Sequence, residues 1–156
     1  LEIRETRNGK GICATREYLP EELLFEVTGT QISGDLDEDI DDITRSNAFR
    51  LSEDLYISPA GSIGDFQNHS CEPNAKVIKR DERLYVAAAR NIQRGEEVLI
   101  DYSTITGADD IWEMECNCGS SACRGIVRDF ASLPEEIKMK YLMSGIVPDY
   151  IVALSS

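Results

Sequence analysis

The residues best suited to chemistry lie in one short segment, residues 64–74, which reads GDFQNHSCEPN. It contains the only histidine of the protein, His69, and one of five cysteines, Cys71. Asparagine, serine and aspartate side chains compete with the backbone for hydrogen bonds, and Pro73 has no amide proton to donate. We therefore expect a fixed, irregular loop, and such loops commonly carry binding or catalytic residues.

Three more cysteines lie close together toward the C-terminal end, in the pattern C-x-C-x4-C: Cys116, Cys118 and Cys123. An odd number of cysteines with this clustering is awkward for a secreted disulfide framework. In an intracellular protein it favours a metal site. Free thiols, or a disulfide in an oxidising compartment, are the alternatives.

Zinc usually takes four cysteine or histidine ligands in a tetrahedron, so the cluster lacks one ligand. The candidates for the fourth ligand are Cys13, Cys71 and His69. We favour Cys71, because it lies in the irregular loop, whereas Cys13 lies in an expected strand and fits a buried core thiol. A site completed by Cys71 would fasten the tail to this loop, and metal binding would help to fold a short polar segment.

Nucleophilic catalysis by the loop is not expected. His69 and Cys71 are separated by one residue, which makes it hard for the imidazole to act as a base on that thiol. No second histidine is present for a metal triad, and no spaced Ser-His-Asp set is visible. We interpret His69 as a residue that fixes loops through its two ring nitrogens.

Length and charge narrow the function classes. A chain of 156 residues fits one domain. The net charge of −13 argues against nucleic acid as a direct partner and favours basic peptides, although acidity can also serve only solubility. No apolar run approaches the roughly 20 residues that span a bilayer, and no signal peptide is visible. We expect an intracellular protein without a membrane partner, cytoplasmic or, in a eukaryote, nuclear.

The elements that must position these residues are mostly short strands. Asn8-Gly9 is a strong hairpin signal. The expected strands are residues 1–6, 11–17, 23–27, 47–52, 54–58, 75–80, 83–90 and 97–102. Residues 35–42, DLDEDIDD, are expected to form a solvated loop or an acidic rim for a cationic substrate. Near the C-terminus, Ser132 is predicted to cap a helix that ends at Gly145, and a last short helix follows Pro148.

Three motifs occur in order: NHSCEPN at 68–74, GEEVLIDY at 95–102 and the C-x-C-x4-C cluster at 116–123. Together with the N-terminal NGKGICATREYLPEE, they resemble the SET-domain family of protein-lysine methyltransferases with its post-SET zinc cluster. The resemblance implies a mainly β (β-clip) fold of small curved sheets with knot-like threading. It divides the chain into a SET domain (1–115), a post-SET zinc segment (116–125) and a helical tail (126–156).

The resemblance also implies S-adenosylmethionine as methyl donor and a lysine side chain of a basic protein, a histone or another such as a ribosomal protein, as acceptor. The implied donor contacts are the backbone at Lys10, Gly11 and Ile12, together with Asn68, His69 and Tyr102. The implied structural zinc ligands are Cys71, Cys116, Cys118 and Cys123. Residues 124–126 would close over the adenine, and Trp112 is expected to serve packing.

In such a site Tyr102 would be the catalytic residue, with its hydroxyl at the transferring methyl. The accepting amine must be neutral, although a free lysine has a pKa of about 10.4. Burial of the lysine stem in an apolar channel lowers that pKa, so no strong general base is needed and positioning does most of the work. Acidic groups are therefore expected at the rim rather than in the channel.

Three residues depart from the family pattern. Asp65 replaces an arginine, Val27 replaces a tyrosine, and Ile100 replaces an aromatic residue. Two channel walls would then be aliphatic, with Tyr18 or Tyr56 as possible replacements and with room for multiple methylation. The alternative function is a catalytically weak or inactive SET module that only binds a basic peptide or protein.

Overall fold

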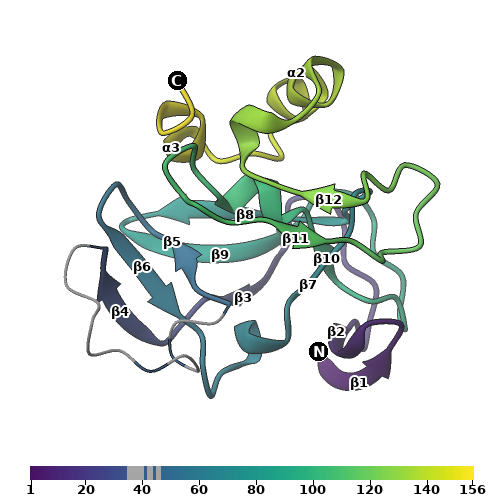
Figure 1. The fold of residues 1–156 in the computed structure, drawn as a ribbon. Coiled ribbons are helices and arrows are strands. Elements are labelled where there is room, and N and C mark those ends of the chain that lie inside the picture. Colours follow the sequence, from purple (N-terminus) through teal and green to yellow (C-terminus); the bar gives the residue numbers. More distant parts are fainter. Residues whose placement is uncertain (35–40, 42–43, 45–46) are drawn as a thin grey trace.

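The structure is a computed structural model that describes residues 1–34, 41, 44 and 47–156 (Figure 1). Its described part is built mainly from short strands in small two- and three-stranded sheets, with two short helices near the C-terminus. The expected mainly β fold is confirmed. The acidic stretch 35–42 lies outside the described residues except for Asp41.

The N-terminal hairpin forms where Asn8-Gly9 predicts it. Strand β1 (Glu2–Thr6) pairs antiparallel with β2 (Gly9–Cys13), with Thr6 opposite Gly9. The second strand starts and ends earlier than expected. The amide of Val98 donates to the carbonyl of Ile12 over 2.7 Å, which joins β2 to the segment 95–102.

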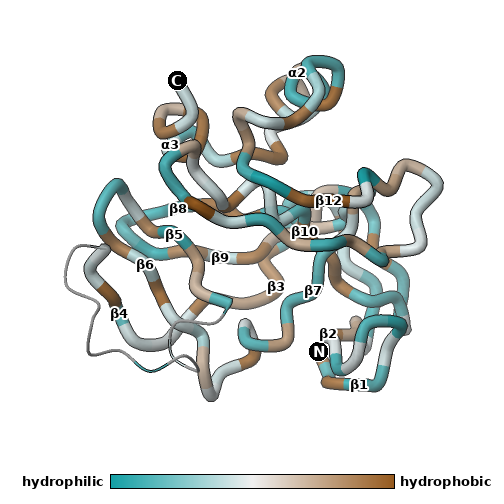
Figure 2. The backbone as a smooth tube through the Cα atoms, in the orientation of Figure 1, coloured by the Kyte–Doolittle hydropathy of each residue, from teal (hydrophilic) through white to brown (hydrophobic). Residues whose placement is uncertain are grey.

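Two three-stranded sheets form the body. One contains β3 (Leu23–Glu26), β9 (Arg83–Ala88) and β8 (Ala75–Arg80), and the other contains β4 (Thr30–Ser33), β6 (Leu55–Ser58) and β5 (Phe49–Arg50). Strand β4 was not expected, because Ile32 is its only buried residue and the others are polar. The core lies between these sheets, and the hydrophobic stretches of β3 and β9 in Figure 2 belong to it.

The central loop meets the GEEVLIDY segment through a short parallel pair. Strand β7 (Asn68–His69) lies beside β10 (Leu99–Ile100), with Asn68 opposite Leu99 and His69 opposite Ile100 (Figure 1). The strand expected over 97–102 is therefore shorter. It ends because the Asp101 carboxylate accepts from the amide of Ser103, which starts the 3-10 helix η3 (Tyr102–Ile105).

The remaining short elements are η2 (Ile63–Phe66), β11 (Met114–Glu115), β12 (Ile126–Val127) and η4 (Phe130–Ser132). Strands β11 and β12 pair antiparallel and enclose the segment that carries the cysteine cluster. The chain then passes through η4 into the helices.

Two helices, α2 (Glu135–Ser144) and α3 (Asp149–Ala153), lie on one side of the strands (Figure 1). The predicted N-cap Ser132 is wrong: Pro134 precedes α2, and Ser132 instead donates to Asp129 at the end of η4. The predicted stop at Gly145 is confirmed, with the left-handed φ of 68° that glycine favours.

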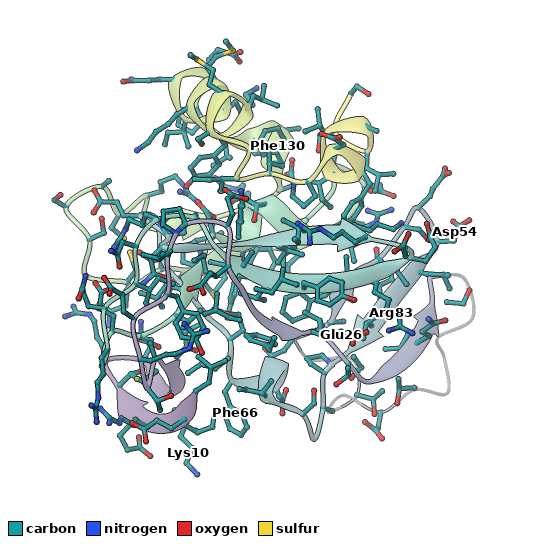
Figure 3. All side chains as sticks on the ribbon, turned by 180° about the vertical axis from the view of Figure 1, so that it is seen from behind. Lys10, Glu26, Asp54, Phe66, Arg83 and Phe130 are labelled. Carbon is teal, nitrogen blue, oxygen red and sulfur yellow. The ribbon has the colours of Figure 1, made fainter. Side chains whose placement is uncertain are left out.

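The helices have an apolar cluster of their own, formed by Phe130, Leu133, Tyr141, Val147 and Ile151. Figure 3 shows Phe130 between the helices and the strands below. None of the helices in the described ranges is long and apolar enough to cross a membrane.

Candidate functional site

Tyr102 lies at the centre of the candidate site, at the point where β10 gives way to η3. Its hydroxyl donates to the carbonyl oxygen of Gln67 over 2.5 Å, and its amide donates to Nδ1 of His69 over 3.0 Å. Burial, with a smaller contribution from the negative charge of Glu97, raises the pKa of Tyr102 well above its usual range. The phenol therefore stays protonated at neutral pH and can act as a donor.

His69 is held as a neutral ring. Burial lowers its pKa to about 4, against the opposing effect of Asp101. Its Nδ1 accepts from the Tyr102 amide, so Nε2 carries the proton and points toward the Cys71 sulfur at 3.4 Å. This geometry fits the interpretation of His69 as a residue that fixes neighbouring segments.

A cavity of about 680 Å³ lies on one side of Tyr102. Its walls are mostly apolar and aromatic, and they include Phe49, Tyr56, Tyr102, Ile105, Asp110 and Trp112. The Trp112 ring lies edge-on to that of Tyr102, with centroids 6.1 Å apart, although Trp112 was expected only to serve packing. The cavity has the shape and chemistry to take an extended aliphatic side chain.

None of the three positions that depart from the family pattern lines this cavity. Val27 and Ile100 are buried in the core cluster, so they are not its aliphatic walls. Of the two tyrosines considered as replacements, Tyr56 lines the cavity, while Tyr18 is buried beneath the guanidinium of Arg16. Asp65 accepts a hydrogen bond from Asn47 at 3.2 Å. Motif position alone did not reveal which way these side chains point.

One acid lies in the cavity wall, contrary to the expectation that acids stay at the rim. The Asp110 carboxylate accepts from the Tyr56 hydroxyl at 2.6 Å, from Arg50 at 3.1 Å and from the Gly107 amide at 2.7 Å. The Arg50 guanidinium pairs with this carboxylate and also with that of Asp109, so it offsets only part of the negative charge at the wall.

A second cavity of about 250 Å³ also has Tyr102 in its wall. Its lining residues are mostly of polar types: Asn8, Asn68, His69, Tyr102, Met114, Glu115, Cys116, Asn117 and Cys118. Five of the residues predicted for the donor and metal sites therefore meet here, from β7, η3 and the cysteine segment. Asn8 and Asn117 were not predicted as site residues from the sequence, although Asn117 lies between the predicted metal ligands Cys116 and Cys118.

The predicted N-terminal donor residues lie beside this second cavity but not in its wall. The carbonyl of Lys10 accepts from the Asn68 amide at 3.1 Å, while the Lys10 side chain points outward (Figure 3). A side chain at Gly11 would collide with Glu97 and with Asn68, which also bond to each other at 2.8 Å. Ile12 is fully buried in the core.

The four predicted metal ligands come together. The sulfur atoms of Cys71, Cys116, Cys118 and Cys123 all lie within 4.8 Å of one another, as a tetrahedral thiolate site requires. Cys13 lies apart from them, 5% exposed in β2, and fits the expected core thiol. This set of donors can hold a metal ion.

The largest feature that sequence reasoning missed surrounds Asp101. This fully buried carboxylate accepts from Arg124 and Tyr141. Arg124 was expected, with residues 125 and 126, to close over an adenine, but its guanidinium turns inward instead. The sequence signals were weak: Asp101 precedes the motif tyrosine, and Arg124 follows the last cysteine.

Comparison with known families settles the relationship that this geometry suggests. The family profile named SET domain matches residues 9–103, which is more than half of the chain. The chain belongs to the SET-domain family. Both cavities, η3 and β7 thus take residues from the SET region, whereas the last three cysteines, Arg124 and Tyr141 lie beyond the match.

Curated relatives are similar to parts of this chain as well. The chain is 40% identical over 91 residues to "Histone-lysine N-methyltransferase, H3 lysine-4 specific" of Emericella nidulans, covering 54% of this chain and 8% of that protein. It is 35% identical over 115 residues to the protein of the same name in Schizosaccharomyces pombe, covering 70% and 12%. It is 30% identical over 132 residues to "Histone-lysine N-methyltransferase trr" of Drosophila melanogaster, covering 78% and 5%. The chain thus spans only a small part of these relatives.

Proposed function

We propose that this protein is a protein-lysine methyltransferase that uses S-adenosylmethionine. The observation that carries the proposal is that Tyr102 lines two cavities whose lining residues differ. The smaller is lined mainly by polar residue types, among them Asn68 and His69, and the larger mainly by apolar and aromatic ones. Membership of the SET-domain family and the relatives named histone-lysine methyltransferases support the same reaction class.

The polar cavity is the proposed donor site. S-adenosylmethionine would supply a methyl group on a positively charged sulfur. Asn68, Asn117 and the imidazole of His69 offer polar atoms for its amino acid and adenosine parts. The contact of Asn68 with the Lys10 carbonyl ties this cavity to the N-terminal hairpin, so Lys10, Gly11 and Ile12 would act through their backbone.

The apolar cavity is the proposed lysine channel. Its aromatic walls would disfavour a charged ammonium and so lower the pKa of the substrate amine toward neutrality. Tyr102 would orient the amine lone pair along the line of attack, and its own hydroxyl is fixed by the Gln67 carbonyl. The ion pair of Asp110 with Arg50 would weaken the attraction of this wall for the charged amine.

The four-cysteine site is proposed to hold a structural zinc ion. It would join Cys71 of the central loop to Cys116, Cys118 and Cys123, and so hold the wall of the donor cavity in place. In this proposal residues 1–115 form the SET domain, 116–125 the post-SET segment and 126–156 a helical tail. None of the five cysteines forms a disulfide, which suits a reducing, intracellular environment.

The proposed substrate is a lysine-containing segment of a basic protein. A net charge of −13 attracts such a partner over long range. The relatives named for lysine 4 of histone H3 make histone tails the first substrates to try, followed by other basic proteins.

The test is methyl transfer from labelled S-adenosylmethionine to histone H3 and to a mixture of basic proteins, by the parent and by Tyr102→Phe. We expect the variant to lose about 100-fold or more in kcat while it keeps donor affinity, because one positioned hydroxyl is removed. Tyr18→Phe is the matched control, since Tyr18 is buried away from both cavities. Donor binding without any transfer by the parent would favour the inactive binding module instead.

A further inference from the structure

The Asp101 carboxylate joins three segments of the chain directly beside the candidate site. Arg124 donates to both of its oxygens, each at 2.8 Å, and the Ser103 amide donates to Oδ1 at 3.0 Å. The hydroxyl of Tyr141 donates to Oδ2 at 2.6 Å. The carboxylate has no exposed surface, so it depends on these donors in place of water.

This carboxylate adjoins both parts of the proposed donor site. Asp101 directly precedes Tyr102, and its Oδ1 lies 3.6 Å from Nδ1 of His69, the atom that accepts from the Tyr102 amide. On the other side, the amide of Arg124 donates to the Cys71 sulfur at 3.4 Å. A shift of the carboxylate would therefore reach Tyr102 and the cysteine cluster together.

Tyr141 is the contribution of α2 to this arrangement. The residue is 2% exposed, whereas its helix neighbours Met139 and Leu142 are 48% and 45% exposed. Its ring packs in the apolar cluster of the helices, and its hydroxyl also reaches the Cys71 carbonyl at 3.5 Å. Helix α2 thus touches the candidate site through the hydroxyl of a single buried tyrosine.

A phenylalanine would fill the same apolar space, so packing alone does not explain the hydroxyl. Without it, one oxygen of a dry carboxylate would lose a donor, and the remaining donors would pull the group toward Arg124 and Ser103. Because Asp101 is next to Tyr102 in the chain, a rotation of this carboxylate would be felt at the Tyr102 amide.

We propose that Tyr141 is a positioning residue for methyl transfer, which fixes the Asp101 carboxylate and thereby the placement of Tyr102, His69 and the donor cavity. The inference rests on the proposed function and extends it to a helix outside the family match. Tyr141 touches no substrate and acts only through Asp101.

The protein offers a matched control on its other C-terminal helix. Tyr150 of α3 is partly buried, and its hydroxyl donates to the Arg50 carbonyl at 2.6 Å. It makes no contact with Asp101 among the hydrogen bonds of the described residues. Tyr141→Phe and Tyr150→Phe thus each remove one buried hydroxyl of similar geometry, and only the first touches the carboxylate.

The experiment compares both variants with the parent in the full chain. Donor affinity is measured by titration calorimetry, kcat and KM by labelled methyl transfer, and the Tyr102 amide resonance by NMR. We expect Tyr141→Phe to raise the donor Kd and KM about tenfold and to shift the Tyr102 amide signal. Tyr150→Phe should lower the thermal midpoint of unfolding about as much as Tyr141→Phe does. It should leave the donor affinity and the Tyr102 amide signal unchanged. Arg124→Lys, which loses the two-point contact with Asp101, should repeat the Tyr141→Phe pattern.

The outcomes separate the two proposals. A parent that neither binds the donor nor transfers methyl groups rejects the proposed function, while the NMR comparison still tests the link from Tyr141 to Tyr102. An active parent whose Tyr141→Phe variant behaves like Tyr150→Phe in every measurement overturns the positioning role. If the Tyr141→Phe variant does not fold, Arg124→Lys provides the test. Unchanged donor affinity in Arg124→Lys would equally overturn the positioning role.

Discussion

Two clusters of arginine, aspartate and tyrosine adjoin the candidate site, and they are built in opposite ways. The donor-side cluster, formed by Asp101, Ser103, Arg124 and Tyr141, buries its carboxylate completely. The acceptor-side cluster, formed by Arg50, Tyr56, Asp109 and Asp110, buries its guanidinium instead. The Arg50 side chain is 1% exposed, whereas that of Asp109 is 63% exposed. Both connect later segments of the chain to the strands.

The two clusters differ in how many acids remain to pair with the donors when one carboxylate is lost. In the donor-side cluster one carboxylate serves all the donors, so no second acid can take its place. In the acceptor-side cluster Arg50 has two acids and also donates to the carbonyls of Ser52 and Glu53. We therefore expect the donor side to be rigid and easily broken, and the acceptor side to tolerate change.

The largest expected effect is loss of the metal. Removal by a strong chelator, or Cys118→Ser, should free the cysteine segment and lower donor affinity about 100-fold or more, because the folding of such segments depends on the ion. Hydrogen exchange should speed up in β12 and α2 but not in β5 and β6. Cys13→Ser is the control that should keep the metal. A parent without bound zinc by elemental analysis would contradict the site, and equal loosening of both sides would contradict the comparison.

The next effect separates the two clusters directly. Asp101→Asn should lower the free energy of unfolding by about 3–5 kcal/mol, because it leaves the Arg124 guanidinium largely buried without its acid. Asp110→Asn should cost only about 1 kcal/mol, because Arg50 keeps Asp109. Urea unfolding of both variants measures the difference. Similar losses for the two would show that the clusters are equally replaceable.

The smallest effect concerns pH. Burial raises the pKa of Tyr102. Burial and the hydrogen bond to Asp110 raise the pKa of Tyr56, so both phenols stay protonated at neutral pH. The stability that they contribute is present below about pH 10, the unfolded value, and is lost only above it. The kcat/KM of methyl transfer should rise from about pH 7 to about pH 9.5 as the amine of the free substrate loses its proton, with no fall within that range. A decline within that range would assign an ionising phenol to catalysis.

The features readable from the sequence are those with local signals. Asn8-Gly9 predicts the first hairpin, Gly145 predicts the end of α2, and the irregular loop around Cys71 together with the cysteine spacing predicts the thiol cluster. Each depends on backbone preferences or ligand spacing that a few neighbouring residues determine. Strand β4 lacked such a signal, because only Ile32 marks its buried face.

The remaining features depend on contacts between distant residues. Asp101 meets Tyr141 from 40 positions away, and no periodicity links the two. Val27 and Ile100 align with channel residues by motif, yet both side chains are buried in the core. Ser132 has the type of an N-cap residue, but Asp129 takes its amide and its hydroxyl. Tertiary packing decides such cases.

The order of the Asp101 partners along the chain has a consequence for biosynthesis. The ribosome delivers Ser103 first, Arg124 next and Tyr141 last, whereas most of the strands that form the core lie before Asp101. N-terminal parts of a chain generally fold first during synthesis. A nascent chain would therefore hold a folded sheet core with an unfinished donor site, and it should gain affinity for a methyl donor only once α2 has emerged.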